Sequence, residues 1–256
     1  MKAWFFAGRG EPYRIAGKTL RFVPGTRPVR LRYQTTENAV NRYDALQLAW
    51  MLNNLAEGDF AIDVGANYGQ CTIVIAATCG ARGTVIAFEP NLFARDVLRR
   101  NFDLNPFLKR ATIESLACSD VAGGEVELYY NGNASNSALV PLATGNQACA
   151  TPRSTRVPVT TLDSYLDQRQ LLKLRFVKID AEGAEIRILQ GARNVLASRA
   201  AILCELHPYA WPQFGNSLQE LKDLVAQCGR RIRYLDQDLE IGEDADYGIV
   251  ALERLK

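Results

Sequence analysis

The chain has 256 residues, of which 48% are hydrophobic and 23% are charged, and its formal net charge is +2 at pH 7. This length suits one large α/β domain or two small ones, and such a domain buries enough surface to fold without disulfide bonds or a structural metal. The small net charge gives no overall field that would require a nucleic-acid or membrane partner. The composition is therefore that of an ordinary soluble globular protein.

The cysteines have no C-x-x-C spacing, and the chain has a single histidine, His207, so a zinc cage is not expected. Several of the cysteines lie in apolar or small-residue runs, where a thiol packs as a small hydrophobic group. Reduced cysteines favour a cytoplasmic location. No segment of the sequence is long and apolar enough to span a membrane. The six cysteines are Cys71, Cys79, Cys118, Cys149, Cys204 and Cys228.

The first part of the chain has a strand-like pattern that changes to a helical one. Residues 19–23 and 29–33 alternate apolar and polar side chains around a Pro-Gly-Thr turn signal, which predicts a β-hairpin. Apolar residues at helical spacing then predict an amphipathic helix over residues 38–58. We therefore expect residues 1–58 to form a hairpin and a helix packed on a main domain of residues 59–256.

The main domain alternates strand and helix patterns, which predicts a parallel α/β sheet with right-handed crossovers. Its last two strands are separated only by a short acidic stretch, so they are expected to form a hairpin that places one antiparallel strand in the sheet. The predicted strands are residues 60–64, 84–88, 111–117, 125–130, 176–180, 201–206, 231–235 and 248–252, and the predicted helices are residues 70–78, 91–104, 184–189 and 218–228.

A long polar segment interrupts this alternation at residues 131–156. Connections of this length inside a compact domain are usually functional or disordered. We expect the segment to form a lid-like insertion over the site.

A glycine-rich turn, I-D-V-G-A-N-Y-G, follows the first predicted strand of the main domain and opens a helix. Its glycines, Gly65 and Gly69, let the backbone turn sharply and approach a ligand at the carboxyl end of the strand. About twenty residues later, Glu89 ends the second strand, at the offset where a carboxylate reaches a ribose diol. The pattern predicts a site for a nucleoside-containing cofactor.

The same turn favours S-adenosylmethionine over NAD. Dinucleotide sites have the pattern G-x-G-x-x-G, but here Asn67 replaces the middle glycine, and Asp63 puts a negative charge near the place of a pyrophosphate. S-adenosylmethionine has no phosphate and carries an ammonium and a sulfonium, which a carboxylate attracts. An NAD-dependent oxidoreductase and a cofactor-binding protein without catalysis remain as alternatives.

Ionisable residues end the next two predicted strands. Lys178, Asp180 and Glu182 lie at the end of one strand, and Glu205 and His207 lie at the end of the other. A hydroxyl nucleophile needs a base, and we expect His207 to serve, with Asp180 or Glu205 orienting it or acting as the base instead. His207 as a plain loop residue is an equal alternative. A divalent metal on the three carboxylates is conceivable, but the spacing does not require one, and no metal is predicted.

Four motifs together resemble the FkbM-type methyltransferases: I-D-V-G-A-N-Y-G, F-E-P, L-A-C-S-D-V-A-G-G-E-V-E-L and V-K-I-D-A-E-G-A-E-I-R-I-L-Q-G. The resemblance runs over about residues 60–191 and more loosely to the carboxyl end. It implies the class I methyltransferase fold, a Rossmann-like sheet of seven mostly parallel strands with a reversed last strand and helices on both faces. This fold agrees with the hairpin predicted above.

The resemblance also implies a site and a reaction. Residues 117–120, with Ser119, would flank the adenine, and Asp180 would lie near the methionine end or the acceptor. The reaction would be O-methylation of a hydroxyl on a sugar, glycolipid or polyketide-type molecule by direct displacement. A nucleic-acid acceptor is not expected, because the N-P-P-[FY] signature of amino-methyltransferases is absent. The implied cofactor-binding residues are Asp63, Gly65, Asn67, Gly69, Glu89, Ser119 and Asp180.

Overall fold

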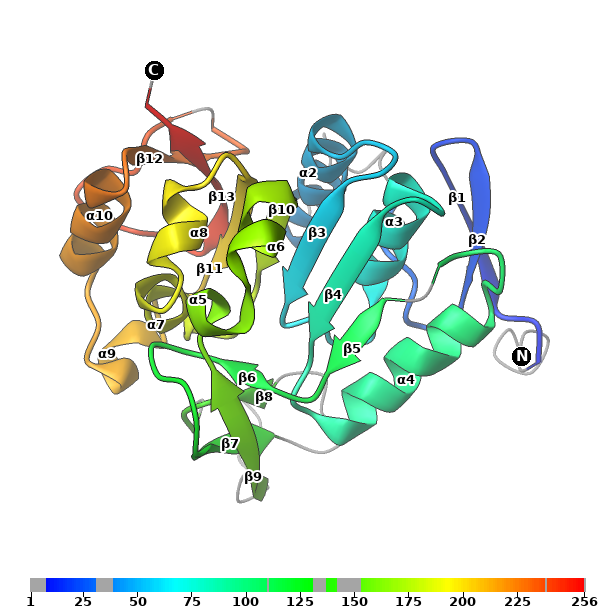
Figure 1. Ribbon diagram of the computed structural model, residues 1–256, viewed down its shortest axis with the longest axis horizontal. Coiled ribbons are helices and arrows are strands. Elements are labelled where there is room, and N and C mark those ends of the chain that lie inside the picture. Colours follow the sequence, from blue (N-terminus) through cyan, green and yellow to red (C-terminus); the bar gives the residue numbers. More distant parts are fainter. Residues whose placement is uncertain are drawn as a thin grey trace.

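A central seven-stranded sheet organises the computed structural model, which describes residues 8–30, 39–109, 111–130, 137–141, 153–237 and 239–255. The strand order across the sheet is β12-β13-β11-β10-β3-β4-β5 (Figure 1). The strands are β3 (Phe60–Val64), β4 (Thr84–Phe88), β5 (Thr112–Glu114), β10 (Leu174–Ile179), β11 (Ala201–Leu206), β12 (Arg230–Tyr234) and β13 (Gly248–Arg254).

The sheet is parallel except at β13. Strands β11, β10, β3, β4 and β5 pair in parallel, whereas β13 is antiparallel to both β11 and β12. A short connection joins antiparallel neighbours, while a parallel pair needs a longer crossover. The connection between β12 and β13 contains no helix among its described residues, in agreement with the predicted hairpin. The class I methyltransferase topology with a reversed last strand is therefore confirmed.

Helices cover both faces of the sheet because successive strand residues point to opposite sides. Ile62 and Val177 face one apolar cluster, and Ala61 and Phe176 face the other. No helix in the described ranges has the length and apolar character needed to cross a membrane. On the first face lie α5 (Leu162–Tyr165), α6 (Gln168–Lys173), α7 (Glu185–Gln190), α8 (Arg193–Ala197), α9 (Trp211–Phe214) and α10 (Leu218–Gln227), and on the second face lie α2 (Ala39–Asn54), α3 (Gln70–Cys79) and α4 (Leu92–Asp103).

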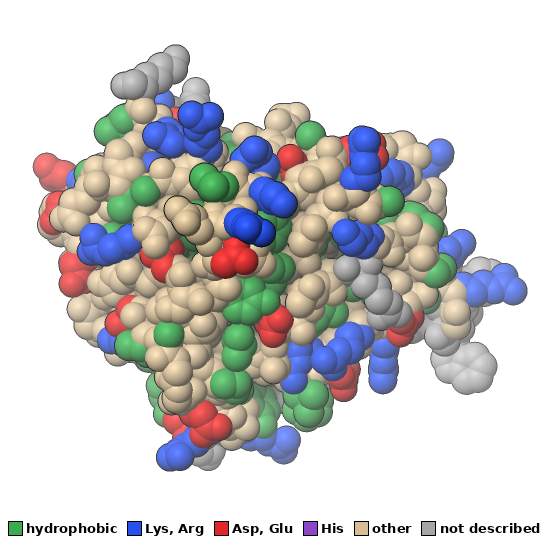
Figure 2. Space-filling model, viewed as in Figure 1, with side chains coloured by type: hydrophobic (Ala, Val, Ile, Leu, Met, Phe, Trp, Pro, Cys, Tyr) green, Lys and Arg blue, Asp and Glu red, His purple; other side chains and the backbone are tan. Residues whose placement is uncertain are grey.

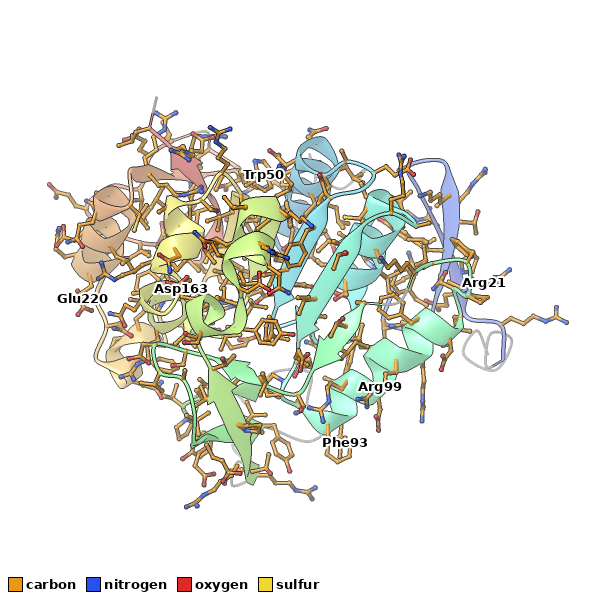
Figure 3. The ribbon with its side chains drawn as sticks, viewed as in Figure 1. Arg21, Trp50, Phe93, Arg99, Asp163 and Glu220 are labelled. Carbon is orange, nitrogen blue, oxygen red and sulfur yellow. The ribbon has the colours of Figure 1, made fainter. Side chains whose placement is uncertain are left out.

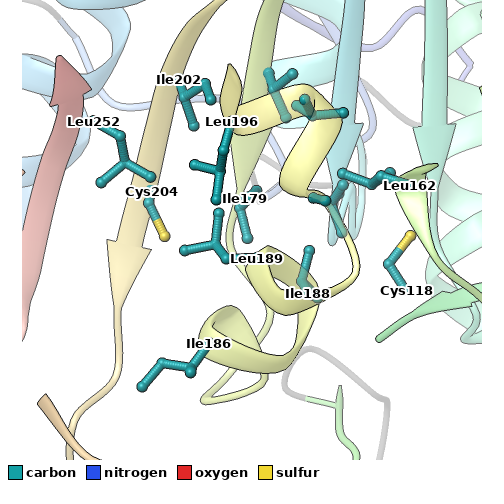
Figure 4. Close-up of a cluster of buried hydrophobic side chains, with 14 of the residues drawn as sticks. Cys118, Leu162, Ile179, Ile186, Ile188, Leu189, Leu196, Ile202, Cys204 and Leu252 are labelled. Atoms are coloured by element: carbon teal, nitrogen blue, oxygen red, sulfur yellow. The ribbon is translucent and has the colours of Figure 1, made fainter. Parts of the chain in front are cut away.

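Both helical layers dock through closely packed side chains. Leu189 of α7 and Leu196 of α8 are fully buried and face the side chain of Ile179 on β10 (Figure 4). On the opposite face, Trp50 of α2 is labelled in Figure 3. The centroid of its ring lies 5.9 Å from that of Phe176. Aromatic pairs at this separation add to the free energy gained by burial. The helix predicted over residues 38–58 is thus confirmed as α2 and fixed to the sheet.

The N-terminal hairpin is formed by other segments than those predicted. It pairs β1 (Glu11–Ile15) with β2 (Lys18–Phe22) around a turn at Ala16 and Gly17. Both turn residues have positive φ angles, 48° and 75°, as a two-residue hairpin turn of type I′ requires. The hairpin predicted from residues 19–23 and 29–33 was therefore wrong: residues 29–30 form no strand, and residues 31–33 lie outside the described part.

A second, four-stranded sheet lies beyond the carboxyl ends of the main strands (Figure 1). The run predicted at residues 111–117 divides between β5 and this sheet, and residues 125–130 form its strand β7. Most of the predicted lid-like insertion, residues 131–136 and 142–152, lies outside the described residues, but residues 153–156 belong to a strand rather than to a loop. The sheet contains β6 (Ala117–Cys118), β9 (Arg153–Thr160), β7 (Glu125–Tyr130) and β8 (Ser137–Ala138).

Candidate active site

A first pocket opens between the carboxyl ends of β3, β4 and β10 and the second sheet, with an empty volume of about 650 Å³ that is partly open to solvent. Four of the predicted cofactor-binding residues line it, namely Gly65, Asn67, Glu89 and Asp180. The sequence motif and the cavity therefore coincide.

The turn after β3 brings two strand ends into contact. Gly65 has a φ angle of 76°, and a Cβ atom at this position would lie 1.7 Å from the carbonyl oxygen of Asp180. No other residue fits there, because β3 and β10 are adjacent and their ends converge on this turn. Asn67 also has a positive φ, 48°, which is uncommon for a non-glycine residue. The turn thus brings the ends of β3 and β10 into close contact at the pocket wall.

Gly69 serves packing rather than the pocket wall. A Cβ atom there would lie 2.1 Å from Cδ1 of Leu98 on α4, and Gly69 lines neither of the two pockets described here. The glycine therefore lets α3 and α4 pack closely, which fixes the helix that follows the turn.

Glu89 is held by backbone groups at the pocket wall. Its two carboxylate oxygens accept hydrogen bonds from the N–H groups of Asn67, at 2.7 Å, and Asn91, at 2.8 Å. The side chain is almost fully buried, and burial raises the pKa of Glu89 to about 7 although these two bonds and nearby Arg95 lower it. Each oxygen keeps a second lone pair, so the group can still accept hydroxyl donors such as those of a ribose.

The rest of the first pocket is largely apolar. Ala117 and Cys118 line it, but Ser119 does not. The Ser119 hydroxyl donates to Oδ1 of Asp120 at 2.8 Å, and its N–H donates to the carbonyl of Thr160. The predicted adenine-flanking segment therefore contributes its first two residues to the wall. Other apolar lining residues are Val64, Phe88, Leu116, Leu139 and Ile188.

Asp63 lies behind the pocket wall. Its side chain is fully buried on the α3 face, where one oxygen accepts a hydrogen bond from the Thr72 hydroxyl at 2.6 Å and the other lies 3.9 Å from Nζ of Lys178. Burial raises the pKa of Asp63, and Lys178 opposes that shift. Asp63 lines neither pocket. Asp63 is therefore placed to support the turn from behind, and a direct contact with the cofactor stays a prediction.

A second, more polar pocket shares a wall with the first. Gly65, Asn67, Asp180 and Glu182 line both cavities, and the second has an empty volume of about 1230 Å³ that includes open solvent. Glu182 has a positive φ of 50°, so two of the shared wall residues have strained backbones. The remaining polar wall residues include Asp44, Gln47, Lys178, Glu205, His207, Tyr209 and Tyr247.

His207 is buried among carboxylates. Its Nδ1 atom lies 2.9 Å from Oε1 of Glu185, while Nε2 lies 4.0 Å from Asp180, 3.8 Å from Glu182 and 3.9 Å from Glu205. Burial would lower the pKa of His207, but the hydrogen bond to Glu185 and the surrounding negative charges outweigh it and raise the pKa to about 10. The structure thus brings together the three predicted catalytic residues.

Two neighbours orient the carboxylates of this group. Lys178 donates to Oδ2 of Asp180 at 2.9 Å, as strand alternation predicts, and the Tyr247 hydroxyl donates to Oε1 of Glu205. Burial would raise the pKa of Asp180, but Lys178 and His207 bring it below its usual value. Burial and the Asp180 charge raise the pKa of Glu205 to about 7.

Several polar residues of the second pocket were not predicted from the sequence. Asp44 and Gln47 lie on α2, in the same stripe as the buried residues Leu48 and Met51, and two polar residues on an apolar stripe were the available signal. Tyr247 stands directly before β13, with no pattern that marks it. These residues come from parts of the chain that meet only in the folded structure.

Comparison with known proteins shows the family. The family model described as "Methyltransferase FkbM domain" matches residues 63–232, about two thirds of the chain. A hexuronic acid methyltransferase, AglP, of Haloferax volcanii is 27% identical over 75% of this chain and 73% of its own length. The methyltransferase sdnD of Sordaria araneosa is 26% identical over 54% of this chain and 62% of its own length.

Among solved structures, an S-adenosylmethionine-dependent O-methyltransferase of Thermotoga maritima superposes over 100% of this chain and 82% of its own, with a TM-score of 0.48 and 16% identity. The family match does not favour the oxidoreductase alternative. The chain belongs to the FkbM methyltransferase family and is an S-adenosylmethionine-dependent methyltransferase.

Proposed function

We propose that the first pocket binds S-adenosylmethionine and that the second pocket binds a sugar, whose hydroxyl receives the methyl group. The observation that carries this proposal is the shared wall: Gly65, Asn67 and Asp180 line both cavities, so molecules in the two pockets meet there. Such proximity is what a direct displacement requires. The residues fit the cofactor, because the apolar wall suits adenine and Glu89 offers oxygen acceptors to a ribose.

In this proposal the cofactor supplies an electrophilic methyl group, and the chain positions the acceptor and takes its proton. Asp180 and Glu205 present carboxylate oxygens next to the shared wall, and these can accept the hydroxyl proton as the oxygen attacks. Lys178 holds one oxygen of Asp180, which leaves the other toward His207 and the pocket. We assign His207 and the two carboxylates to the reaction as one group.

The second pocket favours a sugar that is not itself strongly anionic. Asp44, Asp180, Glu182 and Glu205 line it, against the cations Lys178 and His207. This excess of carboxylates disfavours the phosphates of a nucleic acid. On the face drawn in Figure 2, basic side chains are also interspersed with acidic ones. AglP is named for a hexuronic acid, a sugar that carries a carboxylate, so this relative supports a sugar acceptor, while the charge of the second pocket favours a less acidic sugar here.

Unpaired thiols at five described cysteines are in keeping with a cytoplasmic location.

The test is a methyl-transfer assay with labelled cofactor across neutral sugars, amino sugars, uronic acids and nucleotide sugars, read by mass spectrometry. We expect label in a sugar product that survives mild alkali, because a methyl ether is stable where a methyl ester is hydrolysed. An alkali-labile product would show methylation of a carboxyl group and contradict the hydroxyl acceptor. Transfer to RNA but to no sugar would contradict the acceptor class.

A further inference from the structure

A set of potential metal ligands converges beside the shared wall. One ligand atom from each of Asp180, Glu205 and His207 lies within 4.8 Å of the other two. Around an octahedral ion with bonds of about 2.1 Å, neighbouring ligand atoms are about 3.0 Å apart and opposite ones about 4.2 Å. The distances from Nε2 of His207, 4.0 Å to Asp180 and 3.9 Å to Glu205, lie in this interval. The group therefore needs only small side-chain movements to close on an ion.

The Nε2 atom of His207 faces the same place. The His207 side chain is only 5% exposed, and Nε2 lies 4.0 Å from Asp180, 3.8 Å from Glu182 and 3.9 Å from Glu205, each beyond hydrogen-bond distance. A cation between this nitrogen and the carboxylates would bring these groups into direct coordination.

Outer contacts already fix the orientation of the histidine. Glu185 holds the Nδ1 atom of His207, and Glu185 in turn accepts hydrogen bonds from the Trp211 indole N–H at 3.1 Å and from the backbone N–H of Gly183 at 2.8 Å. A carboxylate on the far nitrogen of a histidine is the usual support of a metal-binding imidazole. This buried chain of contacts directs Nε2 toward Asp180 and Glu205.

The two carboxylates also have outer partners. Lys178 binds Oδ2 of Asp180, so that Oδ1 is the oxygen that faces His207. The Tyr247 hydroxyl binds Oε1 of Glu205, which is also the oxygen that faces His207. Each of the three potential ligands thus has an outer partner that restricts its rotation, which is the arrangement that preorganises a metal site.

We propose that Asp180, Glu205 and His207 bind one divalent first-row cation at the boundary between the two pockets. Two carboxylates and one imidazole form a mixed oxygen and nitrogen donor set that such ions accept, and His207 releases its Nε2 proton to solvent as the ion binds. The remaining coordination positions would face the second pocket, where a hydroxyl bound to the ion would lose its proton more easily, and the Glu205 oxygen that does not bind the ion would accept that proton. This role in catalysis rests on the proposed function, whereas binding of the ion does not.

The test uses Mn²⁺ as the probe and the whole chain. Chelator-treated protein is titrated with MnCl₂, and free Mn²⁺ is read from its electron paramagnetic resonance signal. We expect about one Mn²⁺ bound per chain, with the affinity reduced at least tenfold in Glu205→Gln and in His207→Ala. Asp44→Asn is the matched control, because it removes a carboxylate of the same pocket that is outside the ligand set, and it should change the affinity less than threefold.

The nitrogen ligand provides a measurement that needs no variant. Spin-echo spectra of the wild-type Mn²⁺ complex should show modulation by a ¹⁴N nucleus, since His207 is the only histidine in the chain. The proposal is overturned if binding is not saturable, if the two ligand variants bind Mn²⁺ like the wild type, or if the nitrogen modulation is missing. Binding of Mn²⁺ without methyl transfer to any sugar would instead contradict the proposed function and leave the cation site standing.

Discussion

The two pockets differ in the part of the chain that builds them. Every residue that lines the first pocket lies within residues 63–232, the span of the family match, and the turn at Gly65 shapes its inner wall. The second pocket adds Asp44 and Gln47 from before this span and Tyr247 from after it. We infer that the family match describes the cofactor side of the enzyme and that selectivity for the acceptor depends on the segments around it.

The largest effect on both pockets is expected from a change in the turn that they share. Gly65→Ala would place its Cβ atom against the carbonyl oxygen of Asp180, at a positive φ angle. We expect a loss of unfolding free energy of about 3 kcal/mol or more, because backbone cannot yield as a side chain can. We also expect cofactor affinity to fall more than about 100-fold. Thermal unfolding and calorimetric titration with S-adenosylmethionine measure the two effects.

The matched control is Gly17→Ala in the N-terminal hairpin. Gly17 has nearly the same φ angle, 75°, but a Cβ atom there would meet no atom within 4 Å. Only the conformational strain remains, about 1–2 kcal/mol, and cofactor binding should be unchanged. Equal losses of unfolding free energy in Gly65→Ala and Gly17→Ala would mean that the clash with Asp180 adds nothing to the cost of the positive φ angle.

The next largest effect is expected at the ribose end of the first pocket. Glu89→Ala removes the acceptor proposed for the ribose hydroxyls and frees the N–H groups of Asn67 and Asn91. We expect cofactor affinity to fall by about 10- to 100-fold, since a hydrogen bond to a charged group contributes about 1.5–3 kcal/mol. Calorimetry measures this change. If affinity is unchanged in Glu89→Ala, Glu89 has no part in binding the ribose.

The raised pKa of Glu89 predicts a pH dependence with a definite sign. Ribose hydroxyls donate to the ionised carboxylate, so affinity should weaken as pH falls through about 7, by about tenfold between pH 8 and pH 6. Stability of the cofactor-free protein should change in the opposite direction, because a buried carboxyl with a raised pKa favours its neutral form and loses stability as pH rises from 4.5 to about 7. In Glu89→Gln, the pH dependence of cofactor affinity and the pH dependence of stability should both be reduced. If the affinity of Glu89→Gln changes with pH as in the wild type, another group causes the pH dependence of binding.

The sequence predicts a residue of this site when neighbouring positions in the chain define that residue. Gly65, Asn67 and Glu89 were predicted because a turn and a fixed offset along the chain define them. Asp63 was assigned to the ligand because it ends a strand, but strand alternation turns its side chain to the α3 face. The N-terminal hairpin was predicted from the wrong segments because its turn, at residues 16–17, includes Ala16 with a positive φ angle. Alanine rarely adopts a positive φ, so this turn has no clear signal in the sequence. Local patterns thus predict strand order and the cofactor turn.

The second pocket was predicted only in part, for a related reason. Glu205 and His207 end one strand, and the parallel sheet places them beside Asp180. Gln47 and Tyr247 are 200 positions apart in the chain, and only the packing of α2 against β11 and β13 brings both to one cavity. Contacts of this kind follow from tertiary structure, and no spacing in the sequence encodes them.

The smallest expected effect therefore tests the least predictable part of the molecule. Gln47 is buried at the second pocket, and its Oε1 atom has no hydrogen-bond partner in the described structure. We expect Gln47→Ala to raise the KM for the sugar acceptor about three- to tenfold, because one neutral hydrogen bond contributes about 0.5–1.5 kcal/mol, while the Kd for S-adenosylmethionine stays the same. Steady-state kinetics and calorimetry separate the two quantities. If Gln47→Ala instead weakens binding of S-adenosylmethionine and leaves the acceptor KM unchanged, Gln47 contributes to the cofactor pocket. Helix α2, which lies outside the family match, would then serve the cofactor as well. That result would contradict the inference that the segments outside the match determine acceptor selectivity.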